Sequence, residues 1–336
     1  MPETTQKSGN KKCIFGDVVK IFFGNRSGVL LLLPFFIASY TLINWFIGYH
    51  TAELNSTGFW GVQFNEDLWW SKISAPLLIL GNALLLNNIF NRNAFMEKNI
   101  YLPALLYVVF RSFFHSFYFL SGVGVVETLL IFALMQVYKL DQNSDGRRAV
   151  FNAAFFIGLA TTVYPIMMIC IPFFFWIIWV LRPFQIRESA LAIVGFILPL
   201  IYAGVYGSFF GIDLTVDFLS SASVEWKFPD IYVITGGVTL LMLFSVGQIF
   251  TKLSTSSIRL KKVFRVNVLL SLFTVALVGV ELLVYRKIDG SSMIVEVLVL
   301  FLPYGFGEKS QRTLPTFLFY LIFFFSVGKF FISFDI

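Results

Sequence analysis

The sequence predicts an all-α fold, a polytopic helical membrane protein with about eleven transmembrane helices. Of its 336 residues, 57% are hydrophobic, 42 are Phe and only 13% are charged, whereas a soluble domain carries about 25% charged residues. Apolar runs of about 20 residues, the length of one membrane crossing, recur from Gly28 to the C-terminus. Basic residues concentrate in every second connection between these runs, as they do in membrane proteins.

The predicted spans are, in order, residues 28–48, 73–90, 100–116, 120–138, 149–163, 166–181, 189–209, 231–250, 266–284, 292–304 and 314–332. Residues 149–181 are divided because Tyr164-Pro165 lies near the middle of a stretch that is too long for one crossing. The tenth span is short and ends at Pro303, so a re-entrant segment is the alternative there.

The ends of the chain are predicted to be tails. The first 27 residues are polar and basic, and the apolar run that follows has no small-residue cleavage site after it, so we expect it to remain as the first span. The expected organisation is a basic cytoplasmic tail at 1–27, a single transmembrane domain at 28–332 and a short tail at 333–336.

The charge distribution predicts the orientation. With the N-terminus in the cytoplasm, 19 of the 25 basic residues fall on the inner side and six on the outer side. Basic residues mark cytoplasmic loops, so the net charge of +6 indicates orientation and gives no reason to expect nucleic acid as a partner. Two longer loops, 49–72 and 211–230, are then outside. Their tryptophans suit the membrane interface: Trp60, Trp69, Trp70 and Trp226.

The sequence offers few groups for cofactor or metal chemistry. His50 and His115 are the only histidines, and Cys13 and Cys170 have no CxxC spacing, so neither a multi-histidine nor a cysteine metal site is expected. The phosphate-binding patterns GxxxxGK[ST] and GxGxxG are absent, and no connection is long enough for a soluble catalytic domain. We therefore expect no cofactor and no metal.

Three polar residues lie in the very apolar segment Phe110–Glu127. Arg111 and Glu127 are each eight residues from a predicted turn near Phe119, which would place both about 12 Å inside the turn of a tight helical hairpin. His115 follows Arg111 by one helical turn on the same face. The favoured interpretation is a buried ion pair that fixes helix register, with His115 beside it. The alternative is an outward pocket in which Arg111 and His115, next to Glu127, bind an anion such as a lipid phosphate.

Two further carboxylates, Glu281 and Glu296, flank a predicted turn near Ile288 and are expected at similar depth. If they were close together they could share a proton and serve proton transfer. The favoured alternative is that each faces a different neighbour, such as Arg286 or Lys287.

Glu66 and Asp67 are adjacent acids in the first outside loop, just before Trp69-Trp70. A carboxylate at the outer surface can act as general base on an acceptor hydroxyl. The commoner case for such a residue is a solvated loop charge.

Three runs resemble an uncharacterised family of bacterial polytopic inner-membrane proteins. They are NNIFNRNAFMEKNIYLPALLYVVF (Asn87–Phe110), FNAAFFIGLATTVYP (Phe151–Pro165) and FWIIWVLRPFQIRE (Phe175–Glu188). The resemblance covers roughly Leu77 to Tyr206 and rests on short motifs in a fixed order. It implies a multi-pass protein of the bacterial inner membrane, and it implies no activity.

The layout also resembles multipass glycosyltransferases of the GT-C fold, in one span, an acidic outside loop, tight hairpins and a GLA…YP helix pair. That resemblance implies transfer of a sugar from a polyprenyl phosphate at the outer leaflet. Glu66 or Asp67 would supply the base, and Arg111, with His115 as a second candidate, would hold the lipid phosphate. The chain lacks the acidic-pair-plus-arginine consensus and an outer soluble domain.

Three function classes follow. The first is a GT-C-like glycosyltransferase or glycolipid-handling protein, with membrane lipids and a polyprenyl-phosphate sugar as partners. The second is a non-catalytic subunit of an envelope assembly for secretion, motility or polysaccharide export, with other membrane proteins as partners. The third is a transporter, which should have a midplane site with broken helices.

Overall fold

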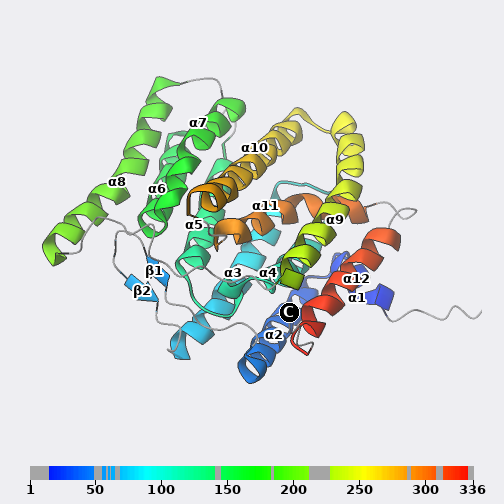
Figure 1. The fold of residues 1–336 in the computed structure, drawn as a ribbon. Helices are drawn as coiled ribbons and strands as arrows, with labels where there is room; N and C mark the ends of the chain where they lie inside the picture. Colours follow the sequence, from blue (N-terminus) through cyan, green and yellow to red (C-terminus); the bar gives the residue numbers. More distant parts are fainter. Residues whose placement is uncertain are drawn as a thin grey trace, which may run out of the picture.

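The computed structural model describes residues 15–48, 55–57, 60, 62–64, 69–140, 145–182, 185–211, 228–285, 289–307 and 313–331. Twelve α-helices dominate this part of the chain (Figure 1). They are α1 (Phe15–Phe22), α2 (Leu33–Ile47), α3 (Trp69–Arg92), α4 (Leu102–Arg111), α5 (Gly122–Val137), α6 (Arg147–Val163), α7 (Cys170–Leu181), α8 (Ile186–Phe210), α9 (Phe228–Thr255), α10 (Ile258–Val280), α11 (Met293–Phe301) and α12 (Thr313–Gly328).

Short elements connect or extend these helices. The 3-10 turns are η1 (Ser27–Leu32), η3 (His115–Phe117), η4 (Pro165–Ile169), η6 (Asp289–Ser292) and η7 (Leu302–Phe306), and a π-helical turn follows α10 at Glu281–Tyr285. The all-α expectation needs one small correction between α2 and α3. Strands β1 (Asn55–Thr57) and β2 (Val62–Phe64) pair there in antiparallel register, with Ser56 opposite Gln63.

The membrane character of the chain is supported by helix length and composition. Five described segments are long and apolar enough to cross a bilayer: Ser27–Ile47, Trp69–Arg92, Ile186–Phe210, Val233–Thr255 and Ile258–Leu283. Five shorter apolar segments of 10–17 residues accompany them: Leu102–Arg111, Gly122–Val137, Pro165–Leu181, Gly290–Phe306 and Thr313–Gly328. All eleven predicted spans coincide with helical segments, but a total of eleven crossings stays a prediction.

The predicted division of residues 149–181 is confirmed. Helix α6 ends at Val163, Tyr164 adopts an extended conformation with φ of −132°, and Pro165 opens η4. The ring of proline favours the first position of a new helical turn and disfavours a helical conformation in the residue before it. The chain therefore breaks at the proline and continues as η4 and α7.

The predicted third span, 100–116, is wrong in its last five residues, 112–116. Helix α4 ends at Arg111, so it has only ten residues and is about 15 Å long, half the thickness of the hydrocarbon layer. All ten residues are buried, and α4 packs against α2, α3 and α11. After Arg111 the Ser- and Phe-rich run forms η3, and the Ser112 side chain turns back to donate to the carbonyl of Val109, 2.7 Å away.

Helix α6 packs between α5 and α8 (Figure 1). Two glycines permit the close approach of α6 and α8. A Cβ atom at Gly158 of α6 would collide with the carbonyl oxygen of Phe196, and one at Gly195 of α8 would lie 2.7 Å from the carbonyl oxygen of Phe151. Small residues at such crossings let helix backbones approach closely, which is how membrane helices gain packing energy.

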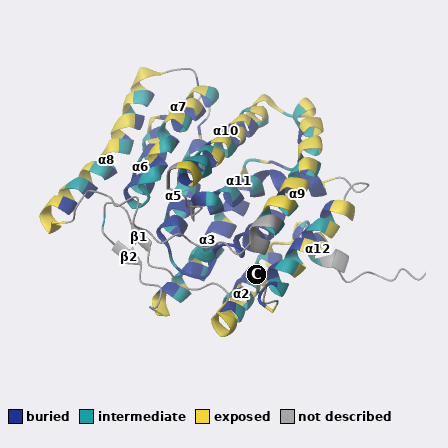
Figure 2. Ribbon diagram, viewed as in Figure 1, coloured by how far each residue is buried: buried dark blue, intermediate teal, exposed yellow. Residues whose placement is uncertain are grey.

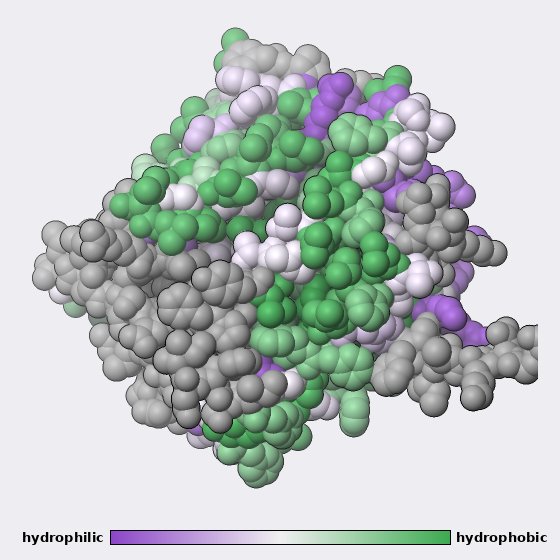
Figure 3. Space-filling model, turned by 45° about the vertical axis from the view of Figure 1, so that its right-hand side comes forward, coloured by the Kyte–Doolittle hydropathy of each residue, from purple (hydrophilic) through white to green (hydrophobic). Residues whose placement is uncertain are grey.

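The buried interior and the exposed flanks involve different helices (Figure 2). Helices α4, α5 and α11 are largely buried, whereas α8 and α9 carry many exposed large apolar side chains, including Phe209, Leu243 and Phe250. Apolar side chains also cover much of the described face in Figure 3. Such a surface is expected of a protein whose surroundings are lipid chains.

The connections that the topology places on the inner side lie together. The ring of Phe95, between α3 and α4, contacts those of Tyr138, after α5, and Phe264, early in α10. The hydroxyl of Tyr304 donates to the carbonyl of Phe95, 2.5 Å away. The helices therefore alternate in direction as the predicted topology requires at these connections.

Candidate functional site

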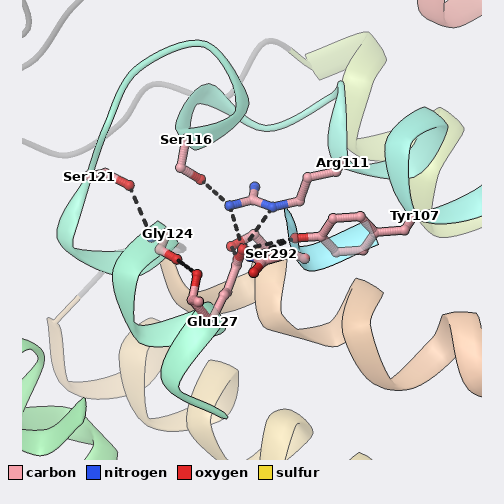
Figure 4. Close-up of polar contacts among 9 residues, drawn as sticks. Tyr107, Arg111, Ser116, Ser121, Gly124, Glu127 and Ser292 are labelled. Atoms are coloured by element: carbon pink, nitrogen blue, oxygen red, sulfur yellow. Dashed lines mark hydrogen bonds and ion pairs between the residues drawn. The ribbon is translucent and has the colours of Figure 1, made fainter. Parts of the chain in front are cut away.

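The predicted pairing of Arg111 with Glu127 is confirmed. The guanidinium Nε and Nη2 atoms lie 3.0 and 2.9 Å from Oε2 of Glu127, and neither side chain is exposed (Figure 4). Two nitrogens on one carboxylate oxygen make a charge-assisted contact, the strong class of hydrogen bond. A buried pair of this kind is costly to break, because removal of one partner leaves an unpaired charge and destabilises by about 3–5 kcal/mol.

Other polar groups complete this cluster (Figure 4). Ser292 of η6 donates to Oε1 of Glu127 at 2.5 Å, and Nη2 of Arg111 donates to the Ser116 hydroxyl at 2.7 Å. The Tyr107 hydroxyl lies 3.5 Å from Oε2 of Glu127. The pair is thus tied to three separate parts of the chain: α4, the η3 turn and η6.

The two helices do not form the predicted tight hairpin. Helices α4 and α5 each pack on α3 rather than closely on one another, and the long Arg111 side chain bridges the remaining space. The start of α5 is fixed locally by Ser121, whose hydroxyl accepts from the backbone N–H of Gly124 at 3.3 Å. A serine at this position satisfies an otherwise unpaired N–H at the helix start.

The predicted position of His115 is wrong. Because α4 ends at Arg111, His115 opens the η3 turn instead of following Arg111 on one helical face. Its ring stacks on Phe119, with centroids 5.0 Å apart, and the neighbouring Ser116 takes the contact with Arg111. The role of Arg111, His115 and Glu127 in binding a substrate stays a prediction.

Glu281 and Glu296 face different neighbours, which was the favoured interpretation. Arg286 and Lys287, suggested there as neighbours, lie outside the described residues. Glu281 accepts a hydrogen bond from the Tyr164 hydroxyl at 2.6 Å and from the backbone N–H of Gly290 at 3.0 Å. Glu296 lies instead within electrostatic range of Arg111 and Glu127. The two acids therefore do not form the carboxylate pair that was the alternative.

An apolar groove lies between α2 and α3, beside the loop after η3. Its volume is about 550 Å³, within the range of ligand pockets. Most of its lining is apolar, and its polar groups come from Thr41, Asn44, Lys72 and Tyr118. Among the described residues, Lys72, in the first turn of α3, is the only charged one in the lining, and none of the others forms an ion pair with it.

The predicted catalytic acids, Glu66 and Asp67, lie outside the described residues. In sequence they precede Lys72 by six and five residues, directly before α3 begins at Trp69. Sequence reasoning gave Lys72 no role beyond its place in the charge count. The signal was present in the sequence, because Lys72 is a basic residue two positions after the Trp69-Trp70 pair that was predicted to lie at the membrane interface.

Neither metal-ligand geometry nor similarity to known proteins indicates a function for this site. Within the described ranges, no three His, Cys, Asp or Glu side chains gather as a metal site. No protein-family model, curated protein or solved structure matches the chain.

Proposed function

We propose that this chain is a glycolipid-handling membrane protein that takes the lipid of a polyprenyl-phosphate-linked sugar into the groove between α2 and α3. The proposal is carried by one observation, an apolar groove in which Lys72 is the one cation among the described lining residues. An isoprenoid phosphate has the same division into a long apolar chain and an anionic head.

The walls of the groove suit a lipid chain. Trp45 of α2 and Leu77 of α3 line it and are 69% and 63% exposed, so the groove opens towards the surroundings of the helices. Burial of apolar surface contributes about 25 cal/mol per Å², which favours a ligand with a long hydrocarbon chain. Asn44 and Thr41 add hydrogen-bonding groups to the lining.

Lys72 is positioned to meet the phosphate. An ammonium group attracts a phosphate as a point charge. His115 stacks on Phe119, which lines the groove, and His115 is not itself part of the lining.

The acceptor would be activated by Glu66 or Asp67. Both precede the first turn of α3, and a carboxylate near the bound phosphate can take a proton from an acceptor hydroxyl as the sugar is transferred. This keeps the glycosyltransferase role within the proposal, with Lys72 added to the residues that the sequence indicated. The groove would bind its lipid whether or not transfer follows.

Arg111 receives a different part in this proposal. It is fully buried and paired with Glu127, so we assign it to holding α4, α5 and η6 together. The same burial favours the second candidate, a non-catalytic subunit of an envelope assembly, because that role needs a rigid membrane scaffold and no exposed arginine.

The binding test uses purified full-length protein and a short-chain polyprenyl phosphate, with the complex measured by native mass spectrometry. Ala38→Phe would fill the groove, since Ala38 lines it, and Ala190→Phe on exposed α8 is the matched control. We expect Ala38→Phe to abolish binding, Lys72→Ala to weaken it about tenfold or more, and Ala190→Phe to leave it unchanged. Binding by Ala38→Phe equal to that of the unaltered protein would overturn the groove assignment.

The transfer test uses membranes with a lipid-linked sugar. We expect Asp67→Asn or Glu66→Gln to stop transfer while protein level and lipid binding are unchanged. Full activity of both variants, or no transfer by the unaltered protein, would contradict the catalytic role of these acids. The protein would then bind the lipid without transferring its sugar. If polyprenyl phosphate is also not bound, the scaffold role is the better description.

A further inference from the structure

Glu296 is a buried acid without a hydrogen bond on one of its oxygens. It is only 6% exposed, and its Oε1 atom has no hydrogen-bond partner among the described residues. It lies one helical turn after Ser292, which donates to Glu127, so Ser292 and Glu296 share a helical face. Glu296 is thereby brought towards the Arg111–Glu127 pair.

If Glu296 were ionised, the region around it would hold two negative charges, on Glu296 and Glu127, and one positive charge, on Arg111. Within the described part of the chain, the charges acting on Glu296 are those of Glu127 and Arg111. Two carboxylates lie within electrostatic range of one guanidinium, and that guanidinium already holds Glu127 through two nitrogens. An uncompensated carboxylate in an apolar interior is very costly, so one positive charge must be supplied from elsewhere.

The other titratable groups near Glu296 that the structure describes cannot supply it. Tyr107 of α4 and Cys170 of α7 are neutral or anionic groups, never cations. Glu281 is a third acid, and it is held by Tyr164 and Gly290.

A small cavity beside Glu296 helps to decide whether a metal cation or a proton supplies the missing positive charge. Its volume is about 50 Å³, and its lining is apolar except for Glu296, Thr274 and Cys170. This is room for about one or two waters. A hard metal cation such as Ca²⁺ or Mg²⁺ takes about six oxygen ligands, which this lining does not provide, whereas a proton needs only the carboxylate.

We propose that Glu296, Glu127 and Arg111 form an intramembrane proton-binding site in which two carboxylates share one guanidinium charge and one proton. In the arrangement of the structure Glu127 holds Arg111, and the proton is assigned to Glu296. When the proton moves, the O–H bond on Glu296 breaks and one on Glu127 forms. Glu296 is then the carboxylate, and Arg111 turns towards it through Nη1, which has no hydrogen-bond partner among the described residues.

Movement of the proton between Glu296 and Glu127 would change which helices the ion pair of Arg111 links. Glu127 is on α5, Arg111 on α4 and Glu296 on α11, so each proton position favours a different helix pair. Ionisable groups inside a membrane frequently mark proton pathways. The site is independent of the α2–α3 groove, because none of these three residues lines it.

The test is carbodiimide labelling of purified full-length protein over a range of pH, with peptide mass spectrometry. Carbodiimides add to neutral carboxylic acids in apolar sites and not to paired carboxylates. We expect an adduct on Glu296 that declines as the pH rises, and little on Glu127. Infrared difference spectra should show the C=O stretch of a neutral carboxylic acid, lost in Glu296→Gln.

The decisive variant is Glu127→Gln. It frees Arg111 to pair with Glu296, which should then ionise, so both the adduct on Glu296 and the acid band should be lost. Glu281→Gln is the matched control and should keep both. An adduct on Glu296 that persists in Glu127→Gln would show an isolated buried acid and overturn the shared site.

Two further outcomes overturn the proposal without any variant. Absence of both the adduct and the acid band in the unaltered protein would show that Glu296 is ionised. Suppression of labelling by sodium at constant pH would show that a metal cation, and not a proton, supplies the missing charge.

Discussion

The ammonium group of Lys329 donates a hydrogen bond to the backbone carbonyl of Ser112, 2.9 Å away and 217 residues earlier in the chain. Lys329 is fully buried, and its ammonium lies 4.7 Å from the ring centre of Phe113. Ser112 is the residue at which α4 ends, and a cation near the C-terminus of a helix is favourable. This hydrogen bond therefore holds the C-terminal end of α12 against the C-terminal end of α4.

We expect Lys329→Met to lower the free energy of unfolding by about 1–3 kcal/mol, because it removes a hydrogen bond from a charged donor. Methionine keeps most of the apolar stem. Thermal unfolding of the purified protein in detergent measures the effect, with Lys261→Met on the exposed face of α10 as control. Equal midpoints for the two variants would show that this contact adds nothing.

The Arg111–Glu127 pair predicts a strong coupling. Arg111→Met should destabilise by about 3–5 kcal/mol, because it leaves the buried Glu127 carboxylate unpaired. Glu127→Met should destabilise less, because Arg111 can then pair with Glu296. The double variant should be more stable than Arg111→Met, since it removes the stranded carboxylate. A double-mutant cycle of unfolding free energies measures the coupling, and additive effects would contradict the pair.

Much of the fold was predictable because local sequence decides it. Apolar runs locate the helices, and Pro165 locates the break before α7. Arg111 and Glu127 were predicted as partners because each lies eight residues from a predicted turn near Phe119 in a very apolar segment. The pair forms although the tight hairpin does not.

The rest depends on contacts between distant segments. Ser292 reaches Glu127 across 165 residues, and the burial of Glu296 beside Arg111 depends on how α11 packs on α4. Helical periodicity does not specify such packing. The end of α4 was also missed, because hydropathy does not separate a helix from the apolar η3 turn that follows it.

The α6–α8 crossing predicts unequal effects of three glycine substitutions. Gly158→Ala and Gly195→Ala should each destabilise by about 1–3 kcal/mol, the usual range for overpacking, because the added methyl meets backbone of the other helix. Gly204→Ala, also on α8, has no atom within 4 Å of the new methyl and should be neutral or slightly stabilising. Unfolding midpoints compare the three, and a uniform response would contradict the close approach.

The surface pair of Glu97 and Lys252 predicts a small pH effect. Nζ of Lys252 lies 2.6 Å from Oε1 of Glu97, and this hydrogen bond and charge lower the pKa of Glu97 below its ordinary value. A lowered folded-state pKa means that the contribution is present at neutral pH and is lost as the pH falls through that pKa.

The matching variant is Glu97→Gln. Its unfolding midpoint should fall slightly below that of the unaltered protein at neutral pH, and the difference should vanish in acid and in high salt. A difference that is constant over pH and salt would assign it to packing instead of charge.

The topology predicts opposite accessibility for Ser56 and Ser254. Ser56 lies in β1, before α3, while Ser254 is near the end of α9, where Lys252 contacts Glu97 beyond the other end of α3. Helix α3 has 24 residues and is about 36 Å long, so the two serines should be on opposite membrane faces. In a Cys13→Ser background, with Cys170 buried, an impermeant maleimide should label Ser56→Cys in spheroplasts and Ser254→Cys only after lysis. The reverse pattern would invert the orientation that the basic residues predict, and labelling of both from outside would show that α3 does not cross the membrane.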